Sequence, residues 1–322
     1  MSDFEQKFEE TKKLGLQIVK ESEQDRLMIL SVGPQHPGSG HFRFTIKIDG
    51  DYIVYCDPDP GYVHRGEEKM CEYRNFIQNI PHHERPVIHD SSNIIYSYSL
   101  AVELLAKIQV PIRGQYLRAL ASELDRISYT LYWLAIYGIF LGHSTMFMWP
   151  TGDRELIIDL YDMLTGARIT HAFNIPGGVR NDIPQNFRDH ALRNIAYLEK
   201  RLIEYEDIFY NNPLLRQRTE GVGILNKQDA IDLGTTGSVL RASGVPFDVR
   251  RAEPYDIYSE LDFKVQYMKT GDSFARAMVP LLDIRESCNI IRQILDKMPQ
   301  SGEVRSKLQP NPKGALENRI KE

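Results

Sequence analysis

The 322-residue sequence predicts an α+β fold that is mainly α, with a central helical bundle and a small β-hairpin region near its N-terminus. Residues 42–56 alternate with a period of two around an Asp49-Gly50 turn, which is typical of a hairpin. From residue 93 to residue 299, apolar side chains recur mostly at helical spacing. With 42% hydrophobic and 26% charged residues, the chain can bury one sizeable core or two smaller ones.

The predicted hairpin follows a loop that reads GPQHPGSGHFRF over residues 33–44. Its prolines and glycines exclude a helix and a central strand, and they surround two histidines, His36 and His41. After the hairpin, glycine, proline and apolar spacing predict a break over residues 57–61, a helix over residues 62–78 and a second break over residues 80–86.

The remaining chain predicts a bundle of helices joined by glycine-rich loops. The expected helices cover residues 94–109, 113–147, 153–166, 187–212 and 273–299, with a loop over residues 172–184. As domains we expect an N-terminal segment (1–30), a small β region (31–60), a helical core (61–299) and a polar tail (300–322) that need not be ordered.

Composition limits the partners and the compartment. The formal charge is −5, and the basic and acidic residues are mixed, so we expect no nucleic-acid partner. The three cysteines form no CxxC pair, and the N-terminus lacks an apolar signal core, which favours reduced cysteines inside the cell. Residues 127–150 carry no charged side chain, but their Ser, Thr, Gly, His and Tyr favour a buried helix over a membrane span.

Few motifs in the sequence point directly to a metal site, a nucleotide site or a catalytic group. His82, His83, His89 and Asp90 lack metal-ligand spacing, so we expect a partly exposed loop there rather than a zinc site. The glycine-rich stretches GGVR and RASG match no nucleotide-binding fingerprint. Several arginines and one histidine lie beside glycine or proline breaks, and as a group they suggest an interface, although any one could form a structural salt bridge: Arg65, Arg85, Arg168, Arg180, Arg241 and His171.

Seven ordered motifs carry a resemblance to a known family. They read GPQHP, GYVHRGEEK, TGARITH, GGVRNDIP, EGVGI, LRASGVPFDVRR and GDSFAR between residues 33 and 276. Together they resemble the NuoD-type subunit of respiratory complex I, the NADH-quinone oxidoreductase, which is related to the large subunit of nickel-iron hydrogenases. Within that family, YGIFLGHSTMFMW and DMLTGARITH look most similar to archaeal subunits of reduced-deazaflavin dehydrogenase complexes.

The resemblance implies a hydrogenase large-subunit-like fold and a peripheral position on the cytoplasmic face of the cell membrane. It implies NuoB-, NuoC-, NuoI- and NuoH-type partners, and a quinone-type, lipid-soluble carrier as substrate. Electrons would come from an iron-sulfur cluster on the NuoB-like partner, with no cofactor or metal held by this chain. Nickel chemistry is excluded on ligand grounds, because residues 85–88 read RPVI where hydrogenases have a CxxC.

The family's site residues transfer only in part. The resemblance implies quinone-binding roles for His36, Gly40, His41, Ile88 and Phe140, with His41 as the catalytic proton donor. Relatives usually have a tyrosine at position 88 and an aspartate at position 140, and their loop histidine lies one residue further along. The residues expected to face the partner's cluster are Arg65, Arg85, Arg168 and His171.

Two functional hypotheses therefore stay open. Either the cavity serves a more apolar carrier, such as a methanophenazine or an unusual quinone, or the chain is a scaffold subunit that has lost quinone chemistry. The electron donor could be NADH, a deazaflavin or ferredoxin. Family members usually continue for several dozen residues beyond the point matching Pro299, so that segment is expected to be encoded separately, truncated or replaced by a differently built cavity.

Overall fold

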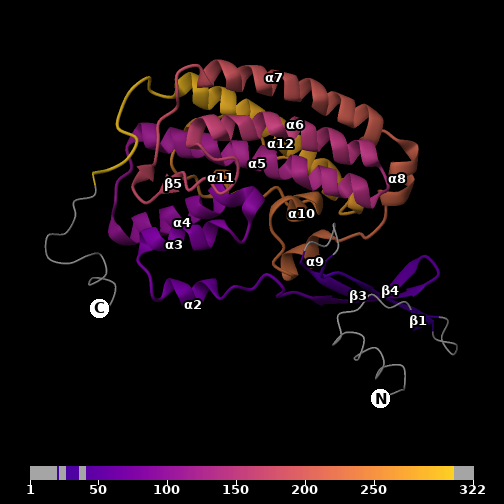
Figure 1. The fold of residues 1–322 in the computed structure, drawn as a ribbon. Coiled ribbons are helices and arrows are strands. Elements are labelled where there is room, and N and C mark those ends of the chain that lie inside the picture. The colour runs from indigo at the N-terminus through magenta and orange to yellow at the C-terminus, as the bar shows by residue number, and fades with distance from the viewer. Residues whose placement is uncertain (1–19, 22–26, 36–40, 308–322) are drawn as a thin grey trace. The chain divides into compact units, whose positions relative to one another are not determined.

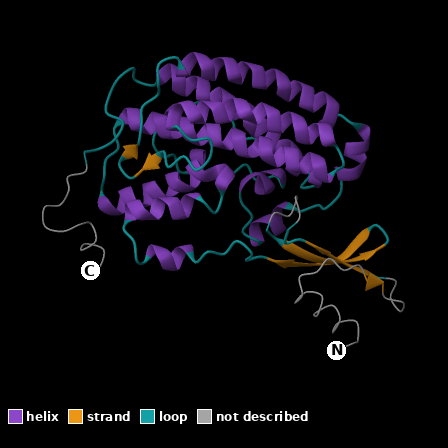
Figure 2. Cartoon of the chain, viewed as in Figure 1, coloured by secondary structure: helices purple, strands orange, loops and turns teal. Residues whose placement is uncertain are grey.

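The computed structural model describes residues 20–21, 27–35 and 41–307. The chain divides into two compact units, Met1–Met70 and Cys71–Glu322 (Figure 1). The predicted fold class, α+β and mainly α, is confirmed: the strands gather mainly in the first unit and the helices in the second (Figure 2).

The first unit contains an antiparallel sheet in the order β1-β2-β3-β4. Its strands are β1 (Lys20–Glu21), β2 (Met28–Val32), β3 (Arg43–Asp49) and β4 (Tyr52–Asp59). The predicted hairpin is confirmed, since β3 pairs with β4 around a turn in which Gly50 has a φ of 58°. The predicted break at residue 57 is wrong, because β4 continues through Pro58 to Asp59. As β4 is the last strand in the sheet order, the missing N–H of Pro58 removes no ladder bond to a further strand.

Two short helices replace the helix predicted over residues 62–78. They are α2 (Glu67–Cys71) and α3 (Phe76–Glu84). Asn75 and Gln78 form a capping box that starts α3, and the helix runs through Pro81, where a break was expected. Because α3 packs along α4, tertiary contacts hold a helix that a proline would weaken in isolation.

The second unit is a helical bundle. In Figure 1, four long helices run alongside one another, and the residue contacts agree: α5 (Ile112–Phe140), α6 (Ser144–Thr165), α7 (Phe187–Tyr205) and α12 (Ser273–Lys297). Their facing sides form the core, as illustrated by Leu117, Leu124, Ile157 and Ile291, which are fully buried. Among the described helices, none combines the length and apolar character that crossing a bilayer requires.

The long helix predicted over residues 113–147 is in fact two helices. α5 ends at Phe140, Gly142 adopts a φ of 79°, and α6 begins at Ser144. The His143 side chain accepts a hydrogen bond from the backbone N–H of Met146 at 3.2 Å and so caps α6. The two helices approach closely, since a Cβ on Gly138 would lie 2.7 Å from that of Met146. Local capping and a tight helix contact thus override uniform apolar patterning.

Smaller elements surround the bundle. α4 (Ser91–Ala106) precedes α5, and the predicted loop over residues 172–184 contains the two-residue strands β5 (Asn174–Ile175) and β6 (Gly178–Val179). The remaining elements are η1 (Ile88–Asp90), η2 (Glu206–Tyr210), α8 (Pro213–Thr219), α9 (Lys227–Asp232), α10 (Gly237–Ala242), α11 (Val249–Ala252) and η3 (Tyr258–Glu260). Residues 300–307 follow α12, and there Ser306 donates its N–H to the carbonyl of Gly177 at 2.8 Å.

Candidate functional site

In the second unit, the end of α3 contacts the loop that follows α6. Glu84, the last residue of α3, is buried, and its carboxylate accepts the backbone N–H of Ala172 at 2.5 Å. This contact ties the end of α3, where Arg85 follows, to the loop that carries Arg168 and His171. Burial raises the pKa of Glu84, although Arg85 and Arg180 act in the opposite direction.

The arginines predicted to face a partner's cluster differ in their surroundings. Arg85 is exposed at the C-terminal cap of α3. Arg168 is also exposed and forms ion pairs with Glu155 and Asp159. Arg65 belongs to the first unit, where its backbone N–H and side chain contact Glu67. Arg85 and Arg168 thus both belong to the second unit, and Arg65 belongs to the first.

His171 is buried rather than displayed at a surface. It is only 4% exposed, and its ring stacks on Tyr161 with 3.8 Å between centroids. Nδ1 lies 3.3 Å from the Ser91 hydroxyl, and Nε2 lies 3.3 Å from the carbonyl oxygen of Arg168. An N–H at Nε2 that donates to this carbonyl, with Nδ1 accepting from the serine, satisfies both contacts. Burial lowers the pKa of His171 to about 4, so the imidazole is neutral near pH 7.

This burial makes protein stability depend on pH. Unfolded His171 titrates near its ordinary pKa, whereas folded His171 resists protonation down to about pH 4. The unfolded state therefore binds more protons in this window, and the free energy of unfolding falls as the pH drops from 6.5 towards 4. We expect His171→Gln to remove up to about 1.4 kcal/mol per pH unit of this dependence, measured by urea unfolding at several pH values. Identical slopes for the two proteins would contradict the assignment.

The predicted quinone-binding positions are divided between the two units. Ile88 in η1 and Phe140 at the end of α5 are 46% and 52% exposed, so both present apolar surface. His41 is exposed just before β3 in the first unit. His36 and Gly40 lie outside the described residues.

A cluster that the motifs do not indicate lies directly beside Ile88. We define the His89 cluster as His89, Ser128, Tyr132 and Arg154. The His89 ring packs against Tyr132 in a tilted arrangement, with a centroid separation of 4.0 Å. Arg154 Nη2 lies 3.0 Å from Nδ1 of His89, and Arg154 Nε donates to the Ser128 hydroxyl at 3.0 Å. No local spacing marks this cluster, because its members come from η1, α5 and α6.

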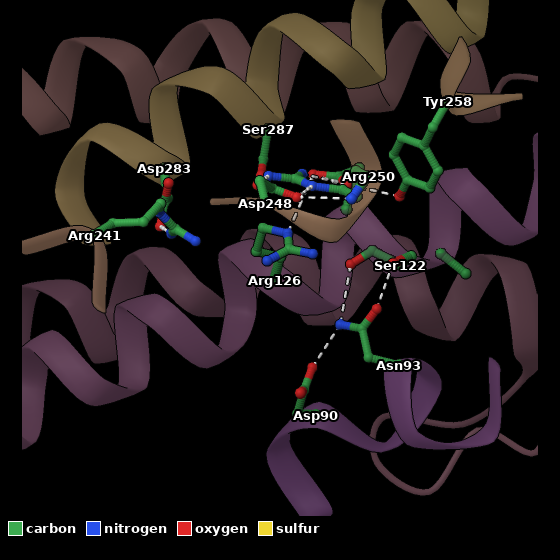
Figure 3. A network of polar contacts seen from close by, with 12 residues as sticks. Asp90, Asn93, Ser122, Arg126, Arg241, Asp248, Arg250, Tyr258, Asp283 and Ser287 are labelled. Atoms are coloured by element: carbon green, nitrogen blue, oxygen red, sulfur yellow. Dashed lines mark hydrogen bonds and ion pairs between the residues drawn. The ribbon is translucent and has the colours of Figure 1, made fainter. Parts of the chain in front are cut away.

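A separate cavity of 660 Å³ lies in the second unit, between α4, α5, α10 and α12. Asp90, Asn93, Arg126, Arg241 and Asp283 contribute polar groups to its wall. Figure 3 shows Asn93 between Asp90 and Ser122, and Arg241 beside Asp283. Burial raises the pKa of both wall carboxylates, Asp90 and Asp283.

Behind the cavity wall, buried charges join three helices. Glu123 of α5 accepts hydrogen bonds from Arg250 Nη1 at 2.8 Å and from the Tyr258 and Ser287 hydroxyls, both at 2.7 Å. Arg250 also bonds both oxygens of Asp248 (Figure 3). Burial would raise the pKa of Glu123, but Arg250 and Arg126 outweigh it and hold that pKa below its ordinary value. The arrangement joins α5, α11 and α12.

Metal sites require groups of ligand side chains that lie close together. Within residues 20–21, 27–35 and 41–307, no three His, Cys, Asp or Glu side chains gather as a metal-ligating group. Cys71 and His83 approach to 3.6 Å between Sγ and Nε2, which is one pair rather than a ligand set.

Comparison with known proteins agrees with the motifs. Residues 141–322 match the family described as the 49 kDa subunit of respiratory-chain NADH dehydrogenase. A subunit of the F(420)H(2) dehydrogenase of Methanosarcina mazei is 42% identical over 273 residues, covering 84% of this chain and 73% of that protein. A subunit of the NADH-quinone oxidoreductase of Thermosipho melanesiensis is 39% identical over 271 residues, covering 84% and 74%.

A solved structure extends the likeness to the fold. A chain of the membrane-bound sulfane sulfur reductase, an archaeal respiratory membrane complex, superposes with a TM-score of 0.85 at 35% identity. The match covers 88% of this chain and 77% of that one. The resemblance predicted from the motifs is therefore confirmed. This chain belongs to the family of the 49 kDa subunit of respiratory-chain NADH dehydrogenase, and it is a subunit of an oxidoreductase complex.

Proposed function

We propose that the chain forms one wall of the cavity in which a lipid-soluble electron carrier is reduced by the terminal iron-sulfur cluster of a NuoB-like partner. The carrier is a quinone or a methanophenazine. The chain would sit peripherally on the cytoplasmic face of the membrane, with NuoC-, NuoI- and NuoH-type subunits as further partners. Family membership supports this role, since relatives include subunits of NADH-quinone and F(420)H(2) oxidoreductases.

One observation carries the proposal. Glu84 ties the end of α3, where the exposed Arg85 follows, to the loop of Arg168 and His171, and the exposed apolar Ile88 lies three residues further along the chain. A persistent positive charge next to apolar surface suits a site where a partner's cluster meets an apolar carrier. His41 would be the proton donor to the carrier, because reduction to the quinol takes two protons.

Replacement of Arg85 by Gln in the assembled complex tests this role. A guanidinium near the cluster favours the reduced state, so its loss should lower the midpoint potential of the partner's cluster. At an effective dielectric constant near 20 and a separation of about 10 Å, the change is about 1.7 kcal/mol, or roughly 70 mV. Potentiometric titration followed by electron paramagnetic resonance measures it.

The matched control is Arg188→Gln, which removes an exposed arginine of α7 that pairs with Asp296. This variant should leave the cluster potential unchanged. An unchanged potential in Arg85→Gln would remove the cluster-facing assignment.

The alternative function is that of a scaffold subunit without quinone chemistry. The apolar residues Ile88 and Phe140 at two expected head-group positions support this alternative. It predicts that the complex assembles with this chain and that added carriers do not change the signal of the partner's iron-sulfur cluster. Adding a short-chain benzoquinone or a phenazine to the reduced complex distinguishes the two: reoxidation of the cluster supports carrier reduction, and no response supports the scaffold.

A further inference from the structure

The neutral tautomer of His89 follows from its contact with Arg154. Arg154 Nη2 lies 3.0 Å from His89 Nδ1, and a guanidinium can only donate hydrogen bonds. Nδ1 must therefore accept, which leaves the proton of the neutral ring on Nε2. A second proton on Nδ1 would point an N–H at the guanidinium. Burial lowers the pKa of His89, and the charge of Arg154 lowers it further.

The ring nitrogen Nε2 of His89 has no hydrogen-bond partner among the described residues. Within the described residues, the hydrogen bond of this ring is made at Nδ1, and the residue is only partly buried. The ring of Tyr132 in α5 lies against the His89 ring at an interplanar angle of 32° and limits its rotation. The result is an oriented N–H donor on a neutral imidazole, which is the form that polarises an acceptor atom without giving up its proton.

Arg154 supplies a buried positive charge directly behind this ring. It is 9% exposed, its Nε donates to Ser128 at 3.0 Å, and its guanidinium carbon lies 5.7 Å from the ring centroid of Tyr132. No carboxylate of the described chain lies within ion-pair distance of it, in contrast to Arg118, which pairs with Glu103. Burial lowers the pKa of Arg154, although more distant carboxylates act in the opposite direction. The Arg154 cation would stabilise negative charge that develops on an acceptor atom bound to Nε2 of His89.

The donor lies next in the chain to one of the expected head-group positions. His89 follows Ile88 directly in η1, and Ile88 is one of the residues to which the proposed function assigns the carrier. Tyr132, whose ring lies against that of His89, precedes Phe140 by eight residues on α5. His89 is therefore adjacent in the chain to one altered position, Ile88, and touches the helix that carries the other, Phe140.

We propose that His89 donates its Nε2–H to the acceptor atom of the electron carrier, and that Arg154 is the positioning residue that fixes the tautomer and offsets the developing charge. The acceptor is a carbonyl oxygen of a quinone or a ring nitrogen of a phenazine. This inference rests on the proposed function. The carrier takes two electrons from the partner's iron-sulfur cluster and two protons from groups other than His89, which keeps its own proton throughout.

Two near-isosteric amides test the donor. His89→Gln places an amide N–H close to the position of Nε2, whereas His89→Asn reaches only as far as Nδ1. In the assembled complex, we expect His89→Asn to lower kcat/KM for a short-chain benzoquinone or a phenazine by about 100-fold, the usual loss for one such donor. His89→Gln should stay within about tenfold of the wild type. A purely structural role would not separate the two amides in this way.

His190 provides the matched control. Its Nδ1 also accepts from an arginine, Arg193, at 2.9 Å, but on the exposed side of α7. His190→Asn should leave kcat/KM unchanged.

For the positioning role, Arg154→Met should lower kcat about tenfold with little change in KM, and Arg154→Lys should recover most of the loss by restoring the charge.

The outcomes separate this inference from the proposed function. Equal kcat/KM values for His89→Asn and His89→Gln, with the partner's cluster signal intact, would overturn the donor role while carrier reduction by the wild type persists. A wild-type complex whose reduced cluster is not reoxidised by either carrier would overturn the proposed function itself.

Discussion

Arg118→Met is expected to lower the free energy of unfolding by about 3–5 kcal/mol. Arg118 of α5 is fully buried and pairs with Glu103 of α4 through two nitrogens, one of them at 2.9 Å from Oε2. Its Nε also donates to the carbonyl of Gly178 at 3.1 Å, and Nη2 donates to that of Ile175 at 2.8 Å. Removing the guanidinium leaves a buried carboxylate and two carbonyls without these partners. Folded proteins usually have a free energy of unfolding of about 5–15 kcal/mol, so the loss expected for Arg118→Met is a large fraction of the total.

Urea unfolding followed by circular dichroism measures this change. The matched control is Arg188→Met, whose ion pair with Asp296 is largely exposed, so that variant should lose less than about 1 kcal/mol. In the double variant Arg118→Met/Glu103→Leu the two losses should not add, because the second change removes the orphaned carboxylate. Strict additivity would show that the pair contributes no coupling between α4 and α5.

Glu123→Gln should destabilise the protein by a similar amount, about 3–5 kcal/mol. The carboxylate receives bonds from Arg250, Tyr258 and Ser287, and it also faces Arg126 at 3.5 Å. An uncharged amide leaves a surplus of buried positive charge between α5, α11 and α12. Because Arg126, which pairs with Glu123, also lines the 660 Å³ cavity, the wall of that cavity should loosen as well.

Unfolding midpoints and amide hydrogen exchange in α11 and α12 check this result. Glu199→Gln is the control, since Glu199 pairs with Arg292 at a half-exposed site and should cost under about 1 kcal/mol. Equal losses in Glu123→Gln and Glu199→Gln would mean that the burial of the network adds nothing to stability.

Much of the fold could be predicted from local pattern. The hairpin around Gly50, the end of α6 at Gly166 and the last helix ending just before Pro299 all follow from turn chemistry, caps and periodicity. The two errors at prolines share a cause. Pro58 at a sheet edge and Pro81 inside α3 lie where a neighbouring element decides whether a proline is tolerated.

The candidate site was predicted less completely than the fold. Motifs indicated Arg85, Arg168 and His171, which the contact between Glu84 and Ala172 relates to one another. They did not indicate His89 or Arg154, because the spacing of the neighbouring histidines suggested only a loop. The pairing of these two residues depends on how α5 and α6 pack beside η1.

The sequence by itself determined the family, the fold class and the boundaries of the strongly capped elements, since these depend on residues close together in the chain. Only the tertiary structure decided that His171 is buried against Tyr161, that Arg118 joins α4 to α5 and that Arg154 orients His89. Those contacts join residues far apart in the chain, and their energies come from burial and charge in a packed interior. No local periodicity encodes which distant charge will meet which ring.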